Sequence, residues 1–168
     1  DTAVATARAD SDGWRQMTLR QRHRIFSRVA AELRRSRGDL IGSAAANTGK
    51  VFPEADVEVS EAIDFAEYYP LSTAAFADID HLRCRGKGVG VVISPWNFPI
   101  AIPCGGIMAA LAAGNTVIFK PSSDAILVAW VLCQCFWRAG VSQNSLQLVP
   151  CSGATTAAKL TNNPAVDF

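Results

Sequence analysis

The segment from Val89 to Ser123 constrains the fold more than any other part of the chain, because it alternates between short strands and a helix. Val89–Ser94 is a brief apolar run rich in β-branched residues, which predicts a buried strand. Ile100–Ala113 is small, apolar and almost uncharged, which predicts a helix packed closely on a sheet, ended by a Gly-Asn pair. Thr116–Lys120 is a second β-branched run. These elements form a βαβ unit, which is parallel and right-handed in nearly all proteins.

Two polar side chains follow these strands at the place where ligands bind to a parallel sheet, beyond the carboxyl ends of the strands. Asn97 comes after the first strand, between Pro95 and Pro99, which fix φ on both sides of the turn. Its side-chain amide is a neutral donor able to stabilise an oxyanion. Lys120 ends the second strand. The alternative for both is structural, a turn asparagine and a surface lysine.

The same stretch resembles the aldehyde dehydrogenase superfamily. The resemblance rests on SPWNFP at residues 94–99 and on GNTVIFKPS at residues 114–122, with the spacing between them that the family has. Glu61–Phe65 reads EAIDF and is followed by Tyr68 and Tyr69, which is similar to the Δ1-pyrroline-5-carboxylate (glutamate semialdehyde) dehydrogenase branch. That branch includes the dehydrogenase half of bifunctional proline-utilisation proteins.

The resemblance covers roughly Leu19 to the end of the chain and implies oxidation of an aldehyde with NAD or NADP. The implied substrate is glutamate semialdehyde, converted to glutamate in proline catabolism. Two alternatives stay open: a relative with another substrate such as succinate semialdehyde, and a non-catalytic nucleotide-binding module. The resemblance also implies a homo-oligomer for the full-length enzyme.

The resemblance implies a role for each candidate residue. Asn97 is the oxyanion donor, and Lys120 binds the adenosine ribose hydroxyls or a 2′-phosphate. Many NAD-using relatives carry a glutamate where this chain has Ser123, so the repulsion of a 2′-phosphate is absent and use of both cofactors stays open. Glu61 would lie by the substrate entrance, with an ordinary surface position as the alternative. The remaining residues that would line the cofactor trench are Ser94, Pro95, Trp96 and Gly153.

Other parts of the family's machinery have no counterpart in this sequence. None of the five cysteines lies in a motif that matches the family's nucleophile, and the general-base glutamate and pyrophosphate-binding turn are expected beyond Phe168. The expectation is therefore an N-terminal fragment that is inactive as a dehydrogenase by itself. His23 and His81 stand alone, and no metal site is expected.

The predicted architecture is an α/β, Rossmann-like parallel sheet with flanking helices, preceded by an N-terminal helical segment. The expected divisions are a loose lead-in at 1–17, N-terminal helices at 18–80 that pack on the cofactor domain, and the Rossmann-like segment at 81–168.

Individual elements follow from caps, breakers and periodicity. Thr18 and Gln21 predict a capping box before an amphipathic helix whose arginine-rich face is expected to be solvated, with nucleic acid or anionic lipid as alternative partners. Gly38 is expected to interrupt this helix, and a short helix is expected at Leu40–Asn47. A further helix is expected from Pro53 to its end at Pro70. Later in the chain we expect a sandwiched helix at Ala125–Arg138 capped by Asp124, a third strand at Leu146–Val149 and a helix from Ser152.

Composition bounds the remaining possibilities. The net charge of +1 gives no reason to expect nucleic acid as a partner, and the most apolar window, Ala125–Trp137, is too short to span a membrane. Five cysteines without paired spacing do not indicate a disulfide framework, so a reducing, cytoplasmic compartment is expected.

Overall fold

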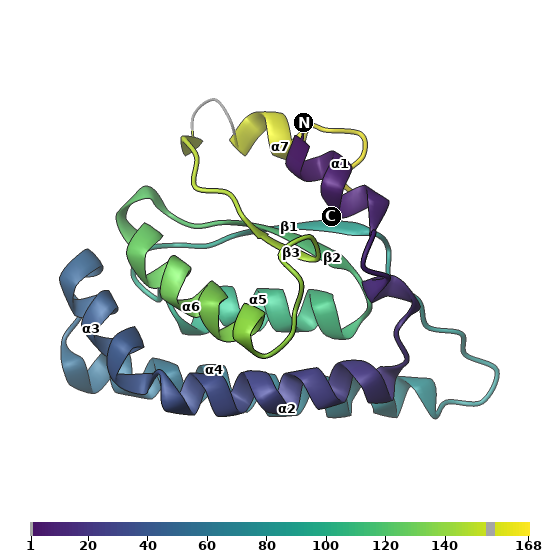
Figure 1. The fold of residues 1–168 in the computed structure, drawn as a ribbon, viewed down its shortest axis with the longest axis horizontal. Coiled ribbons are helices and arrows are strands. Elements are labelled where there is room, and N and C mark those ends of the chain that lie inside the picture. Colours follow the sequence, from purple (N-terminus) through teal and green to yellow (C-terminus); the bar gives the residue numbers. More distant parts are fainter. Residues whose placement is uncertain (1, 154–156) are drawn as a thin grey trace.

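The computed structural model describes residues 2–153 and 157–168, which fold around a parallel three-stranded sheet. The strands are β1 (Val89–Ile93), β2 (Thr116–Lys120) and β3 (Leu146–Leu148), in the order β1-β2-β3. Helices α5 and α6 lie under one face of the sheet, and α2 and α4 form a further layer beneath them, whereas α1 and α7 lie on the opposite face (Figure 1). The α/β, Rossmann-like fold class is confirmed.

The C-terminal residues extend the sheet beyond β1. The backbone N–H of Val91 donates to the carbonyl of Phe168 at 2.8 Å, and Asp167 N–H donates to the carbonyl of Val89 at 2.8 Å. The ring of Phe168 lies against Gly90, where a Cβ atom would come within 2.6 Å of the ring. The close approach of this aromatic ring therefore requires glycine at this point of β1.

The N-terminal residues are a helix, so the expectation of a loose lead-in is wrong for this part of the chain. Helix α1 (Thr2–Ala9) buries Val4 and Ala7 against the sheet. The hydroxyl of Thr116 donates to the carbonyl of Ala7 at 3.0 Å. The sequence showed no cap and no period here, because an eight-residue helix of this composition is stabilised by the sheet beneath it rather than by its own propensity.

Helix α2 (Leu19–Arg35) begins at the predicted capping box, in which Gln21 N–H donates to Thr18 Oγ1 at 3.2 Å. Its arginine face is only partly solvated. Arg22 is 7% exposed and its Nε donates to the carbonyl of Ala112 at 3.2 Å. Ala112 is the last residue of a buried helix, so its carbonyl has no partner within that helix and is satisfied by the guanidinium of Arg22.

The next two helices differ from the predicted boundaries. The helical conformation is interrupted at Ser36, between α2 and α3 (Arg37–Thr48). Gly38 lies inside α3, which ends at the left-handed Gly49. Helix α4 (Phe52–Ala77) continues through Pro70 to Ala77, so Pro70 does not end it. Pro70 is buried, and packing of α4 against α2 and α5 offsets the roughly 3 kcal/mol that an interior proline costs.

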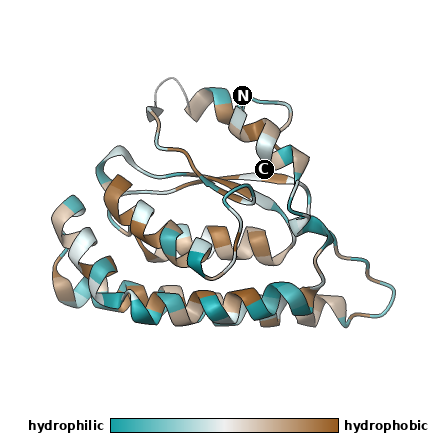
Figure 2. Ribbon diagram, viewed as in Figure 1, coloured by the Kyte–Doolittle hydropathy of each residue, from teal (hydrophilic) through white to brown (hydrophobic). Residues whose placement is uncertain are grey.

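Helix α5 (Ala101–Ala112) is the most apolar helix of the described chain and lies between the sheet and α4 (Figure 2). It ends as predicted, at Gly114 with φ of 87°. Gly105 faces the ring of Phe65 on α4, where a Cβ atom would lie 3.1 Å from the ring. Small residues thus let α5 approach its neighbours closely.

Helix α6 (Ile126–Arg138) is preceded by the 3₁₀ turn η2 (Ser123–Ala125). Ser122 caps η2 by accepting from the N–H of Asp124 at 3.5 Å, and α6 itself has no side-chain cap, so the prediction of Asp124 as its cap is wrong. Helix α6 is sandwiched as expected, between β3 on one side and α2 and α3 on the other, but one edge of it is exposed, with Trp130 49% accessible. Sequence hydropathy gives the apolar surface of a helix but not which parts its neighbours cover.

Two short elements complete the described chain. These are η1 (Trp14–Gln16), which buries Trp14 in the core, and α7 (Ala158–Thr161), which covers the sheet beside α1 (Figure 1). The predicted helix from Ser152 includes residues 154–156, which lie outside the described residues. No helix in the described ranges combines the length and hydrophobicity needed to cross a bilayer.

Candidate functional site

The carboxyl ends of β1 and β2 meet at one edge of the sheet. Ile93 is the register partner of Lys120, and the N–H of Ser94 donates to the carbonyl of Lys120 at 3.3 Å. Both Ser94 and Lys120 are 6% exposed. The turns that follow the two strands therefore start from adjacent points, as the βαβ pattern predicted.

The stem of Lys120 is buried, whereas its Nζ atom reaches the surface and has no partner within the described residues. Within the described residues, no hydrogen bond or ion pair reaches its Nζ atom, although the residue is 6% exposed. A lysine with a buried stem and an accessible ammonium presents its charge at a fixed point of the surface. A ligand oxygen is the natural partner for such an ammonium, so this lysine fits the ribose hydroxyls or phosphate of a nucleotide.

The turn after β1 presents its polar group outward. Pro95, Trp96 and Asn97 are exposed, whereas Pro99 is buried at the start of the next element. In the described part of the chain the side-chain amide of Asn97 makes no hydrogen bond, so both of its N–H groups are available to a ligand. Its backbone carbonyl accepts a hydrogen bond from Lys50 Nζ at 2.7 Å.

A buried ion pair between Lys50 and Glu58 holds the backbone of this turn in place. The ammonium of Lys50 faces Glu58 Oε1. The same ammonium lies over the ring of Phe98, with Nζ 4.1 Å from the ring centroid. The other carboxylate oxygen of Glu58 accepts from the N–H groups of Ile100 and Ala101, at 2.9 and 3.0 Å. A carboxylate at this position neutralises the positive end of α5 and satisfies N–H groups that have no partner in the helix.

The sequence reasoning missed Lys50 and Glu58. It singled out Glu61, which is exposed on α4. The signal for Glu58 was present, because Glu58 lies three residues after Ala55 and one before Val59, on the buried stripe of the helix. An acidic residue on an apolar stripe requires a partner in the interior.

The remaining predicted cofactor residues lie along the same edge or just past it. Ser123 is exposed at the start of η2, one turn beyond Lys120. Gly153 is exposed in the segment after β3, and a Cβ atom built there would meet nothing within 4 Å. The contacts between these residues and a nucleotide stay predictions, since the structure holds no ligand.

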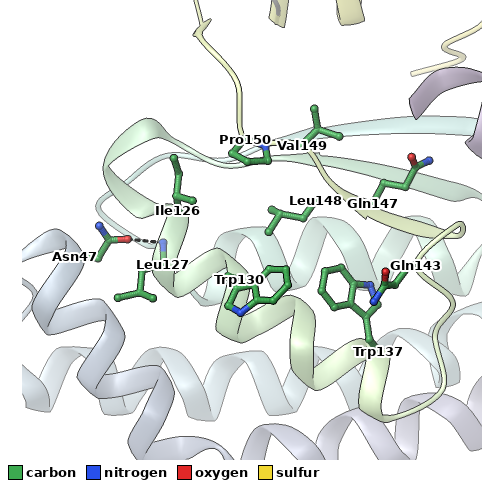
Figure 3. Close-up of a pocket in the computed structure, with 10 residues that line it drawn as sticks. All are labelled: Asn47, Ile126, Leu127, Trp130, Trp137, Gln143, Gln147, Leu148, Val149 and Pro150. Atoms are coloured by element: carbon green, nitrogen blue, oxygen red, sulfur yellow. Dashed lines mark hydrogen bonds between the residues drawn. The ribbon is translucent and has the colours of Figure 1, made fainter. Parts of the chain in front are cut away.

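An apolar groove begins one turn after Ser123 and runs between α6 and β3 (Figure 3). Its volume is about 840 Å³. At one end Ile126 lies near Pro150, and at the other the indoles of Trp130 and Trp137 meet edge to face, with centroids 5.4 Å apart. Flat, apolar surfaces of this kind suit an aromatic ring, and the end at Ile126 adjoins the lysine-bearing turn.

Three of the five cysteines are too deeply buried to supply a nucleophile to this edge. Cys104 and Cys133 are buried, and burial in apolar surroundings raises the pKa of both thiols far above its ordinary value. Burial also raises the pKa of Cys135. Because the thiolate is the reactive form, these three side chains are inert packing residues.

A parallel sheet whose adjacent strand ends carry a lysine and an exposed amide is the arrangement typical of ligand-binding α/β proteins. The particular family follows from comparison with known proteins. The model of the aldehyde dehydrogenase family matches residues 1–168, and the chain belongs to this family.

Similar proteins agree with this assignment. The 1-pyrroline-5-carboxylate dehydrogenase of Anoxybacillus flavithermus is 36% identical over 178 residues, covering 100% of this chain and 35% of the relative. A Thermus 1-pyrroline-5-carboxylate dehydrogenase with bound NAD superposes with a TM-score of 0.91 at 32% identity, over 98% of this chain and 34% of that one. Proline utilization A from Bdellovibrio bacteriovorus gives 0.91 at 31% identity, over 98% and 18%. The chain thus spans about a third of the length of the curated relatives it matches.

Proposed function

We propose that this chain is the part of an NAD(P)-dependent aldehyde dehydrogenase that binds the cofactor and supplies the oxyanion donor. The proposed reaction is oxidation of glutamate semialdehyde, formed from Δ1-pyrroline-5-carboxylate, to glutamate. The observation that carries the proposal is the unpartnered amide of Asn97, held at the carboxyl end of β1 by Lys50. The names of the similar dehydrogenases support the substrate.

In this mechanism Asn97 acts on the aldehyde oxygen. A thiolate from outside these 168 residues adds to the carbonyl carbon, and negative charge develops on the oxygen. The amide N–H of Asn97 is aimed at that charge, so it stabilises the transition state more than the bound aldehyde. The exposure of the amide and the fixed backbone of the turn allow this without prior rearrangement.

The dinucleotide, when bound, supplies the hydride acceptor, and the residues present fit it. Lys120 would bind the adenosine ribose through its unpaired ammonium. Trp96 and the end of the groove at Ile126 offer exposed apolar surface on either side of that position. Ser123 presents a hydroxyl where a carboxylate would repel a 2′-phosphate, so we propose that both NAD and NADP are accepted.

The test is kinetic and uses a chain of full family length that carries these residues. Oxidation of glutamate semialdehyde and of succinate semialdehyde is measured with NAD and with NADP. A higher kcat/KM for glutamate semialdehyde supports the proposal. A higher kcat/KM for succinate semialdehyde would mean that succinate semialdehyde is the substrate instead. Binding of NAD without turnover of any aldehyde would leave a non-catalytic nucleotide-binding module.

Two further properties belong to this proposal. All five cysteines are free, which supports a reducing, cytoplasmic compartment. A homo-oligomer is proposed for the full-length enzyme, and sedimentation of the purified protein tests it.

A further inference from the structure

The turn that carries Asn97 is held at its middle and at its C-terminal end by one buried ion pair. Lys50 Nζ donates to the carbonyl of Asn97 at 2.7 Å, and Glu58 accepts from the N–H groups of Ile100 and Ala101. The two charged groups face each other. A single pair of side chains thus links the middle of the turn, the start of α5 and the N-terminal part of α4.

We infer that Lys50 and Glu58 are positioning residues, which set where the amide of Asn97 points during aldehyde oxidation. The inference rests on the proposed function of Asn97. It adds Glu58 on α4 and Lys50 in the connection between α3 and α4 to machinery that is otherwise at the sheet edge.

The burial of the pair is the first argument for this role. The side chains of Lys50 and Glu58 are 8% and 2% exposed. A buried pair contributes little net stability relative to apolar residues of similar volume, because both ions lose their hydration. A purely stabilising role at this position could therefore be filled by an apolar pair, whereas a cationic donor is needed both to pair with Glu58 and to donate to the Asn97 carbonyl.

The second argument is the directness of the contacts. Lys50 binds the backbone of the residue whose side chain acts, and its ammonium also lies over the ring of the next residue, Phe98, at 4.1 Å. Glu58 fixes the two N–H groups that follow Pro99. With Asn97 itself and the end of so short a turn both held, the peptide planes around Asn97 have little freedom to rotate.

The catalytic consequence follows from the sensitivity of oxyanion stabilisation to geometry. Misplacing a reacting or stabilising group by about 1 Å can cost on the order of a hundredfold in rate. Removing Lys50 frees the Asn97 carbonyl and lets the turn shift, while the cofactor contacts at Lys120 stay in place. The loss is therefore expected in kcat and not in cofactor affinity.

The experiment compares three variants with wild type in a chain of full family length. Lys50→Met keeps most of the apolar stem and removes the ammonium. Lys50→Met/Glu58→Gln removes both charges and keeps an oxygen to accept from Ile100 and Ala101, so it avoids an unpaired buried carboxylate. The matched control is Arg37→Met, which breaks the ion pair with Asp56 between α3 and α4, of 2.6 Å, without touching the Asn97 turn.

The measurements are kcat per active site, the cofactor dissociation constant, the melting temperature, and the crystal structure of each folded variant. We expect both Lys50 variants to lose about ten- to a hundredfold in kcat, with the cofactor constant changed less than about threefold. Arg37→Met should lower the melting temperature and keep kcat within about twofold. The crystal structures should show Asn97 displaced or disordered in the Lys50 variants and unchanged in the control.

Two outcomes would overturn the inference. One is a double variant with wild-type kcat, and the other is an Asn97 turn in its original position in the crystal structure. If the wild-type enzyme oxidises no aldehyde, the proposed function fails, and the crystal structures still decide whether the pair positions Asn97.

Discussion

The N–H of Ser94 donates to the carbonyl of Lys120 across 3.3 Å, so the turn that bears Asn97 starts beside the lysine proposed to bind the cofactor. This contact continues the register of β1 and β2 by one residue. It places the proposed chemistry and the proposed cofactor contact on adjacent strand ends of a rigid sheet. The two roles are separable by mutation, because the side chains involved belong to different turns.

Replacing Asn97 with alanine should lower kcat by about a hundred- to a thousandfold, since the lost donor acts on charge that develops in the transition state. Cofactor affinity should change little. Steady-state kinetics and a cofactor titration on the full-length enzyme check this, with Asn162→Ala, exposed at the end of α7, as control. A variant that retains wild-type kcat would remove Asn97 from the mechanism.

Cofactor choice should respond to Ser123 and Lys120. Wild type is expected to use NADP within about 1–2 kcal/mol of NAD, which is about a five- to thirtyfold ratio in kcat/KM. Ser123→Glu should widen the ratio in favour of NAD by repelling the 2′-phosphate, and Lys120→Ala should weaken NADP more than NAD. Kinetics with both cofactors test this, and a ratio unmoved by Ser123→Glu would show that Ser123 does not face the ribose.

The 168-residue chain by itself should show no dehydrogenase activity. Cys104, Cys133 and Cys135 are buried and burial raises the pKa of each thiol, so none supplies a thiolate at neutral pH. An assay for NADH formation with glutamate semialdehyde checks this. Turnover that a cysteine substitution within the chain abolishes would contradict it.

Arg22→Met should destabilise the fold by about 2 kcal/mol, because the buried carbonyls of Ala112 and Met17 lose their donor. The matched control is Arg24→Met, an exposed position on the same helix, which should stay within about 0.5 kcal/mol of wild type. Urea unfolding followed by tryptophan fluorescence measures both. Equal midpoints for the two variants would mean that Arg22 behaves as a solvated residue.

Part of the free energy of unfolding is expected to depend on pH through the carboxyl group of Asp167. The N–H of Val89, followed by the guanidinium of Arg8, lowers the pKa of this carboxyl below its ordinary value. A lowered folded-state pKa gives stability that is present above the unfolded pKa of about 3.9 and lost as the pH falls through the folded value.

Asp167→Asn should therefore cost about 1 kcal/mol at neutral pH and flatten the fall in stability below about pH 4. Asp80→Asn, at an exposed position, serves as control. Thermal unfolding from pH 3 to pH 7 gives both curves. A variant whose stability still falls as steeply as that of wild type would show that other carboxylates dominate.

The sequence by itself determined the βαβ unit, the capping box at Thr18, the left-handed end at Gly114 and the positions of Asn97 and Lys120 at the strand ends. These features depend on residues close together in the chain: β-branched runs, caps and breakers fix the backbone locally. The family resemblance rested on the same short segments.

Tertiary structure alone decided the rest. Pro70 remains inside α4 because packing on both sides outweighs a lost hydrogen bond, and α1 is helical because the sheet covers its apolar face. The partners of Glu58 are Lys50, eight residues earlier, and the N–H groups of α5, over forty residues later. Their pairing depends on how α4 and α5 pack, and the free energy of packing is set by surfaces that meet only in the folded chain.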